Sequence, residues 1–114
     1  MADKYLIAGL GNPGRQYRDN RHNVGFQTIE HLAERHGLPF SRMQEGALVA
    51  TGRIAGQPVI LAKPQKYMNR SGGPVAALAR FYKIPLSNLL VIFDDLDLPT
   101  GTIRLRPAGA AGDQ

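Results

Sequence analysis

The sequence has 114 residues, of which 43% are apolar and none is cysteine, and 14 Lys and Arg against nine acidic residues give a net charge of +5. This length predicts one domain, the apolar content excludes a disordered chain, and the lack of cysteine excludes disulfides and thiolate chemistry. Neither an apolar run of the roughly 18 residues that span a bilayer nor a signal peptide is present, so we expect a cytoplasmic protein without a membrane partner.

The spacing of apolar residues predicts strands that alternate with helices. The predicted elements, in chain order, are a strand at 5–8, a helix between 23 and 37, strands at 47–54 and 58–62, a helix between 71 and 84, and strands at 89–93 and 102–106. This order predicts an α/β fold, a three-layer sandwich with a mixed, twisted sheet. Three polar turns, at 12–22, 63–69 and 94–97, each follow a strand. Ligands bind beyond the carboxyl ends of strands in such sheets.

Residues 9–14 read GLGNPG, which has the glycine spacing of a dinucleotide-binding turn. Such a turn also needs a helix that begins within the motif and an acidic residue at the end of a second strand. Helical periodicity begins only beyond Asn23, so we interpret the glycines as a tight turn that presents the Asn12 amide. Asn12, Asn23 and Asn69 could position a substrate or hold an oxyanion, with Met68 as an apolar wall.

His22 ends the first polar turn and is the candidate general base, because an imidazole can accept a proton near neutral pH. Its alternative is a surface or capping residue, which is how we interpret His31 and His36. Asp94 follows the most apolar strand and is the candidate carboxylate that orients the imidazole. The alternatives for the turn at 94–97 are a structural brace or a Mg²⁺ or Mn²⁺ site, although no further acidic cluster completes a metal shell. Without a nucleophile elbow, these groups favour hydrolysis by activated water.

Three longer segments can be compared with known families: GLGNPGRQYRDNRHNVGF at 9–26, KPQKYMNRSGGPV at 63–75 and FDDLDLPTGTIRLR at 93–106. Together, in this order and spacing, they resemble bacterial-type peptidyl-tRNA hydrolases over essentially the whole chain. The resemblance implies a monomeric cytoplasmic esterase that cleaves the ester between peptide and tRNA in peptidyl-tRNA. It also implies that no metal and no cofactor is needed, and that the partners are peptidyl-tRNA and tRNA.

The resemblance assigns roles to individual positions of this sequence. His22 matches the catalytic histidine of the family, and Asp94 matches the aspartate paired with it. The positions that match substrate-binding residues are Asn12, Tyr17, Met68 and Asn69. Arg106 falls where the family has a basic residue that contacts a tRNA phosphate, and we expect Arg104 to share this role.

Members of the family are longer than this sequence. Residues 111–114 align with the start of a segment that usually reads G-G-H-N-G, and the family continues beyond it. We therefore expect residues 1–114 to form a single α/β domain that corresponds to the N-terminal portion of a longer family domain, with weak or no activity alone. The alternative is a non-catalytic tRNA- or RNA-binding module, whose binding weakens with salt and yields no product.

Overall fold

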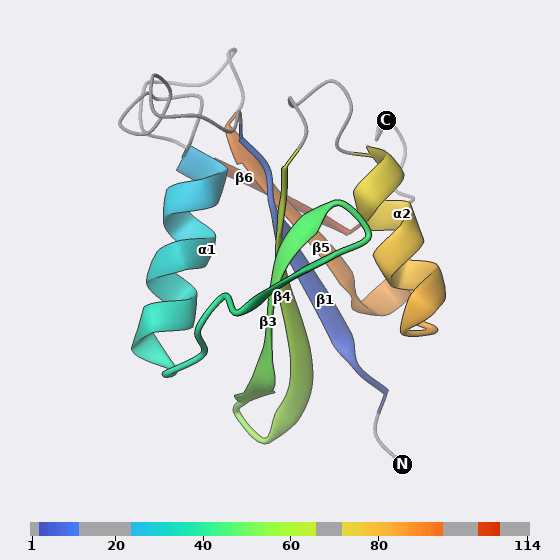
Figure 1. Ribbon diagram of the computed structural model, residues 1–114, viewed down its shortest axis with the longest axis horizontal. Helices are drawn as coiled ribbons and strands as arrows, with labels where there is room; N and C mark the ends of the chain where they lie inside the picture. The colour runs from blue at the N-terminus through green and yellow to red at the C-terminus, as the bar shows by residue number, and fades with distance from the viewer. Residues whose placement is uncertain (1–2, 12–23, 66–71, 95–102, 108–114) are drawn as a thin grey trace.

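The structure is a computed structural model that describes residues 3–11, 24–65, 72–94 and 103–107 (Figure 1). Its elements, in chain order, are β1 (Tyr5–Gly9), α1 (Val24–Arg35), β2 (Arg42–Gln44), β3 (Ala47–Ile54), β4 (Gln57–Pro64), α2 (Gly72–Phe81), the 3-10 turn η4 (Leu86–Asn88), β5 (Leu89–Asp94) and β6 (Ile103–Pro107). The predicted alternation of strands and helices is confirmed, and β2 and η4 are additions to it.

The strands form one mixed sheet in the order β2-β3-β4-β1-β5-β6. β1 lies at the centre and runs parallel to both β4 and β5, whereas the outer pairs β2–β3, β3–β4 and β5–β6 are antiparallel. Helices α1 and α2 lie on opposite sides of the sheet (Figure 1), so the predicted three-layer α/β sandwich is confirmed. No helix in the described ranges is long and apolar enough to cross a membrane.

The β3–β4 hairpin differs slightly from its predicted form. Its turn consists of Ala55 (φ 53°) and Gly56 (φ 79°), and two consecutive residues with positive φ are typical of the tight turns that match the twist of paired strands. We predicted a polar loop from residue 63, but the ladder continues to the pairs Leu48–Lys63 and Ala47–Pro64. Lys63 therefore belongs to a strand, and that part of the prediction is wrong.

Among the described residues, the core consists of two apolar clusters, one on each side of the sheet. Leu6 and Ala8 of β1 face the cluster that contains Leu78 of α2. Val59 and Leu61 of β4 belong to the opposite cluster, under α1. Because successive side chains of a strand point to opposite faces, strands β1, β3, β4 and β5 contribute apolar residues to both sides of the sheet.

Leu78→Ala is expected to lower the free energy of unfolding by about 2–5 kcal/mol, because it leaves a cavity between α2 and the sheet. The Leu78 side chain is 0% exposed. Leu86→Ala is the matched control: its side chain is 63% exposed, so its cost should stay within about 0.5 kcal/mol. Urea denaturation measures the unfolding free energy of both variants, and equal losses would show that Leu78 is not a core residue.

Candidate active site

The carboxyl ends of three strands lie side by side at one edge of the sheet. β4 and β5 flank β1 and run in the same direction, with the register Ala8–Ala62 on one side and Gly9–Ile92 on the other. The hydrogen bond from the Leu10 N–H to the Ile92 carbonyl (2.9 Å) continues the β1–β5 pairing past the end of β1. These strands come directly before the segments in which we predicted the functional polar turns, so the described backbone leads into all three from the same edge.

The structure places three of the predicted site residues by their backbone. Asp94 is the last residue of β5 and pairs with Ile103 of β6. Arg104 and Arg106 lie in β6, opposite Phe93 and Val91. The predicted residues outside the described ranges are Asn12, Tyr17, His22, Asn23, Met68, Asn69, Asp95 and Asp97.

The first turn of α1 packs directly on the ends of β1 and β5 through two glycines. A Cβ atom at Gly25 would collide with the Leu10 carbonyl oxygen and lie 2.6 Å from that of Ile92. A Cβ atom at Gly9 would collide with the Gly25 carbonyl oxygen and lie 2.7 Å from Cγ2 of Ile29. We interpreted Gly9 as part of a tight turn that presents Asn12, and Gly25 has no evident role from the sequence alone. Gly9 is thus a packing residue, and α1 begins at Val24, well after the glycine motif, unlike the helix of a dinucleotide-binding turn.

This packing places the start of α1, which follows His22 in the sequence, against the strand that ends at Asp94. Gly25 is three residues after His22, and Ile92, whose carbonyl it approaches, is two residues before Asp94. Neighbouring Cα atoms are about 3.8 Å apart, so each candidate residue lies within about 12 Å of chain from this contact. The glycine contact is therefore compatible with an imidazole–carboxylate pair at this edge.

The end of β4 is held by a hydrogen bond to the β2–β3 turn and by a second one back to β4 itself. The Gln65 N–H donates to the Gly46 carbonyl (2.9 Å), and Gln65 Nε2 donates to the Lys63 carbonyl (3.0 Å). The turn itself has positive φ at Glu45 (53°) and Gly46 (82°). These bonds fix the backbone immediately before the segment that contains Met68 and Asn69.

Lys63 connects the end of β4 to α1 and to Phe40 in the segment between α1 and β2. Its Nζ atom lies 2.7 Å from Oε2 of Glu30 and 4.5 Å from the centroid of the Phe40 ring. Its side chain is only 13% exposed, against 51% for Glu30. Sequence reasoning missed this residue because it was assigned to a loop. Val59, Leu61 and Lys63 follow one another at every second position, and the first two face α1, so this alternation was the available signal.

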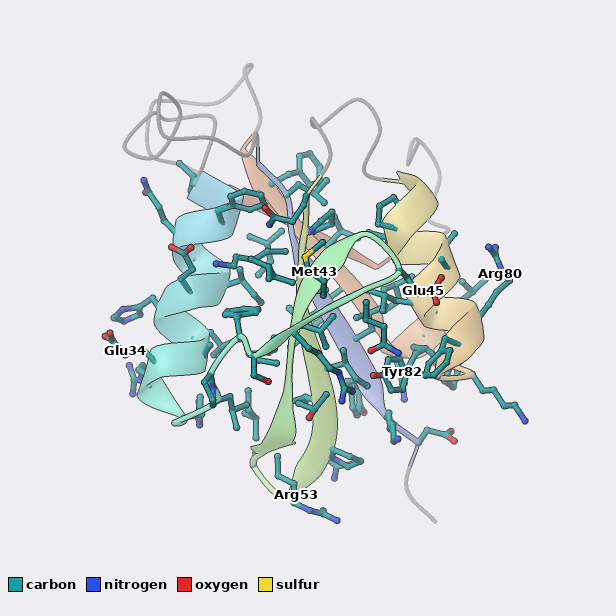
Figure 2. The ribbon with its side chains drawn as sticks, in the orientation of Figure 1. Glu34, Met43, Glu45, Arg53, Arg80 and Tyr82 are labelled. Atoms are coloured by element: carbon teal, nitrogen blue, oxygen red, sulfur yellow. The ribbon has the colours of Figure 1, made fainter. Side chains whose placement is uncertain are left out.

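Two of the three histidines are described, and both agree with their interpretation as surface residues. His31 lies on α1, His36 follows the end of that helix, and both are exposed. Figure 2 shows the neighbouring Glu34 side chain on the outer side of α1, directed away from the sheet. These histidines are therefore suitable comparison positions for His22.

Comparisons with known proteins give a consistent result. The family model described as peptidyl-tRNA hydrolase matches residues 6–114. A peptidyl-tRNA hydrolase of Chloroflexus aggregans is 57% identical over 109 residues, which cover 95% of this chain and 58% of that protein. A chloroplastic CRS2-like protein of rice is 51% identical over 112 residues, which cover 98% of this chain and 60% of that protein.

A solved structure agrees with these sequence matches. The crystal structure of the peptidyl-tRNA hydrolase from Acinetobacter baumannii has a TM-score of 0.84 and 40% identity to this chain. The match covers 93% of this chain but 55% of that one. The chain therefore spans little more than half the length of the relatives it matches.

Proposed function

The chain belongs to the peptidyl-tRNA hydrolase family, and from this premise we propose that it serves to hydrolyse the ester bond between peptide and tRNA in peptidyl-tRNA. The observation that carries the proposal is the family match over residues 6–114, which includes all three segments with candidate site residues. The partners would be peptidyl-tRNA and tRNA, and the protein would act as a cytoplasmic monomer. Residues 1–114 would be the N-terminal portion of a longer family domain.

The mechanism requires a base, a group that orients it, and donors for the developing negative charge. His22 would take a proton from water, with Asp94 holding the imidazole in the productive orientation. The water would attack the ester carbonyl, and the amides of Asn12 and Asn69 would position the substrate and stabilise the oxyanion. The ribose oxygen would then leave as a hydroxyl by taking up the proton held on His22. The contact of Gly25 with the Ile92 carbonyl supports this pairing, because it brings the two chain segments together.

The remaining candidate residues would contribute to binding. Tyr17 and Met68 would line the pocket for the substrate's terminal region. Arg104 and Arg106 lie on the strand beside β5, and a guanidinium can donate two parallel hydrogen bonds to a phosphate. We therefore assign these arginines to the tRNA phosphates, next to the strand that ends at Asp94.

Peptide release from an N-acetylated aminoacyl-tRNA tests this function. We expect slow release by the 114-residue chain. Release should be at least about tenfold faster from a fusion to the part of the Chloroflexus aggregans relative that follows its matched region, because a more complete cleft positions the ester better. Equal rates would contradict the expected weakness of the chain alone. tRNA binding without product from either protein would favour the RNA-binding module and overturn the hydrolase proposal.

A further inference from the structure

We propose that Lys63 is a positioning residue, which fixes α1 on the sheet in the orientation that the active site needs; this inference rests on the proposed function. Lys63 does not contribute to the glycine contact, and the resemblance assigns it no role in catalysis or binding. The backbone of Lys63 is part of β4, and its ammonium group contacts Glu30 of α1 (2.7 Å) and the Phe40 ring (4.5 Å). Three separate elements therefore meet at one side chain.

The geometry of α1 explains why a second fixed contact matters. The helix touches the strand ends through Gly25, and Glu30 comes five residues later, which is about 140° around the helix axis and about 7.5 Å along it. Between them, Ile29 is 0% exposed and makes apolar contacts. Apolar packing has little directional preference, whereas an ion pair at hydrogen-bond distance defines one position. Together, Gly25 and Glu30 fix both the height and the rotation of the helix.

Stability alone does not account for a lysine at this position. The Lys63 side chain is 13% exposed but that of Glu30 is 51% exposed, and an ion pair with a solvent-exposed partner contributes little to stability. The neighbouring positions of β4 on the same face, Val59 and Leu61, are buried in an apolar cluster. Methionine at position 63 would suit these surroundings, so the charge serves a purpose other than core packing.

The consequence of losing this contact would appear at the start of α1. Val24 is two residues after His22, so a rotation or shift of the helix displaces the candidate base relative to Asp94. Misplacement of a reacting group by about 1 Å can cost about a hundredfold in rate. A helix held by the glycine contact alone would spend less time in the productive orientation.

Four variants of the 114-residue chain test the inference: Lys63→Met, Lys63→Arg, Glu30→Gln and the double variant Lys63→Met/Glu30→Gln. Lys63→Met should lower kcat for peptide release about tenfold, with KM within about twofold of the parent. The double variant should be no slower than Lys63→Met, because the two residues act as one pair. Lys63→Arg should recover most of the rate, and the melting temperature of Lys63→Met should not fall below that of the parent.

Arg53→Met is the matched control, since it removes the same charge. Arg53 lies at the far end of the β3–β4 hairpin, away from the strand ends of the candidate site (Figure 2), and donates a hydrogen bond to the Gly56 carbonyl (2.8 Å). Its kcat should equal that of the parent. Equal kcat values for Lys63→Met and Arg53→Met would overturn the inference. So would a raised KM with unchanged kcat, which would instead indicate that Lys63 binds the RNA.

Amide hydrogen exchange provides a test that does not depend on activity. Exchange in the first two turns of α1 should be faster in Lys63→Met than in Arg53→Met, by about fivefold or more, because the helix opens locally more often. Equal exchange in the two variants would overturn the inference. If the parent and its fused form release no peptide, the hydrolase proposal fails, and the exchange comparison alone decides whether Lys63 fixes α1.

Discussion

Replacement of His22 by alanine is expected to lower kcat for peptide release by about 100-fold or more, the usual contribution of a general base. Without the imidazole, water must attack the ester without a group that removes its proton. Binding of tRNA should be retained, because the proposed phosphate contacts come from Arg104 and Arg106 on β6 rather than from the turn that carries His22. Single-turnover release from N-acetylated aminoacyl-tRNA measures the chemical step, and a filter-binding titration measures the affinity.

His31→Ala is the control for this experiment, because it removes an imidazole from an exposed position of α1. We expect its kcat to equal that of the parent. The His22→Ala variant should also keep the parent's unfolding midpoint in urea, which would show that the loss is chemical. Undiminished peptide release by His22→Ala would remove this residue from the role of general base.

Gly25→Ala is expected to lower the free energy of unfolding by about 1–3 kcal/mol and to lower kcat as well. Helix propensity acts in the opposite direction, because alanine is favoured over glycine by about 1 kcal/mol within a helix. The added methyl group must, however, displace the carbonyls of Leu10 or Ile92, and these belong to the strand ends on which the site is built. Urea denaturation and peptide release measure the two effects separately.

Gly72→Ala is the matched substitution in the other helix. Gly72 is the first residue of α2, and a Cβ atom there would have no heavy atom within 4 Å. We expect its unfolding free energy to remain within about 0.5 kcal/mol of the parent or to rise. If Gly25→Ala were as stable and as active as Gly72→Ala, close packing of α1 on the strand ends would not matter to the site.

Hydrophobic periodicity predicted most of the fold, because the central strands and both helices bury regular apolar sets. It could not predict β2, since Arg42, Met43 and Gln44 contain no such alternation. This strand depends instead on the Glu45–Gly46 turn and on pairing with β3. Likewise, Lys63 and Pro64 resemble turn residues locally, and only the β3–β4 register includes them in a strand. In both segments, pairing with a neighbouring strand and not the local sequence determines the strand conformation.

The location of the candidate site was predictable, whereas the contacts that support it were not. Parallel strands that end together make one edge of the sheet the expected place for ligands, and β4, β1 and β5 do end together. The Gly9–Gly25 approach has no periodic signature, because glycine has no side chain to count. The ion pair of Lys63 with Glu30 joins residues distant in sequence. The pairing of His22 with Asp94 stays a prediction.

The central position of β1 has a consequence for how the chain folds. β1 is made first, yet its hydrogen-bonding partners are β4 and β5, which follow much later in the sequence. During synthesis, the apolar strand β1 therefore has no partner strand until β4 has emerged, whereas the β3–β4 hairpin can pair locally. Non-local strand pairing is slow and exposes apolar segments to aggregation. We expect refolding to be limited by the insertion of β1 between strands that have already formed.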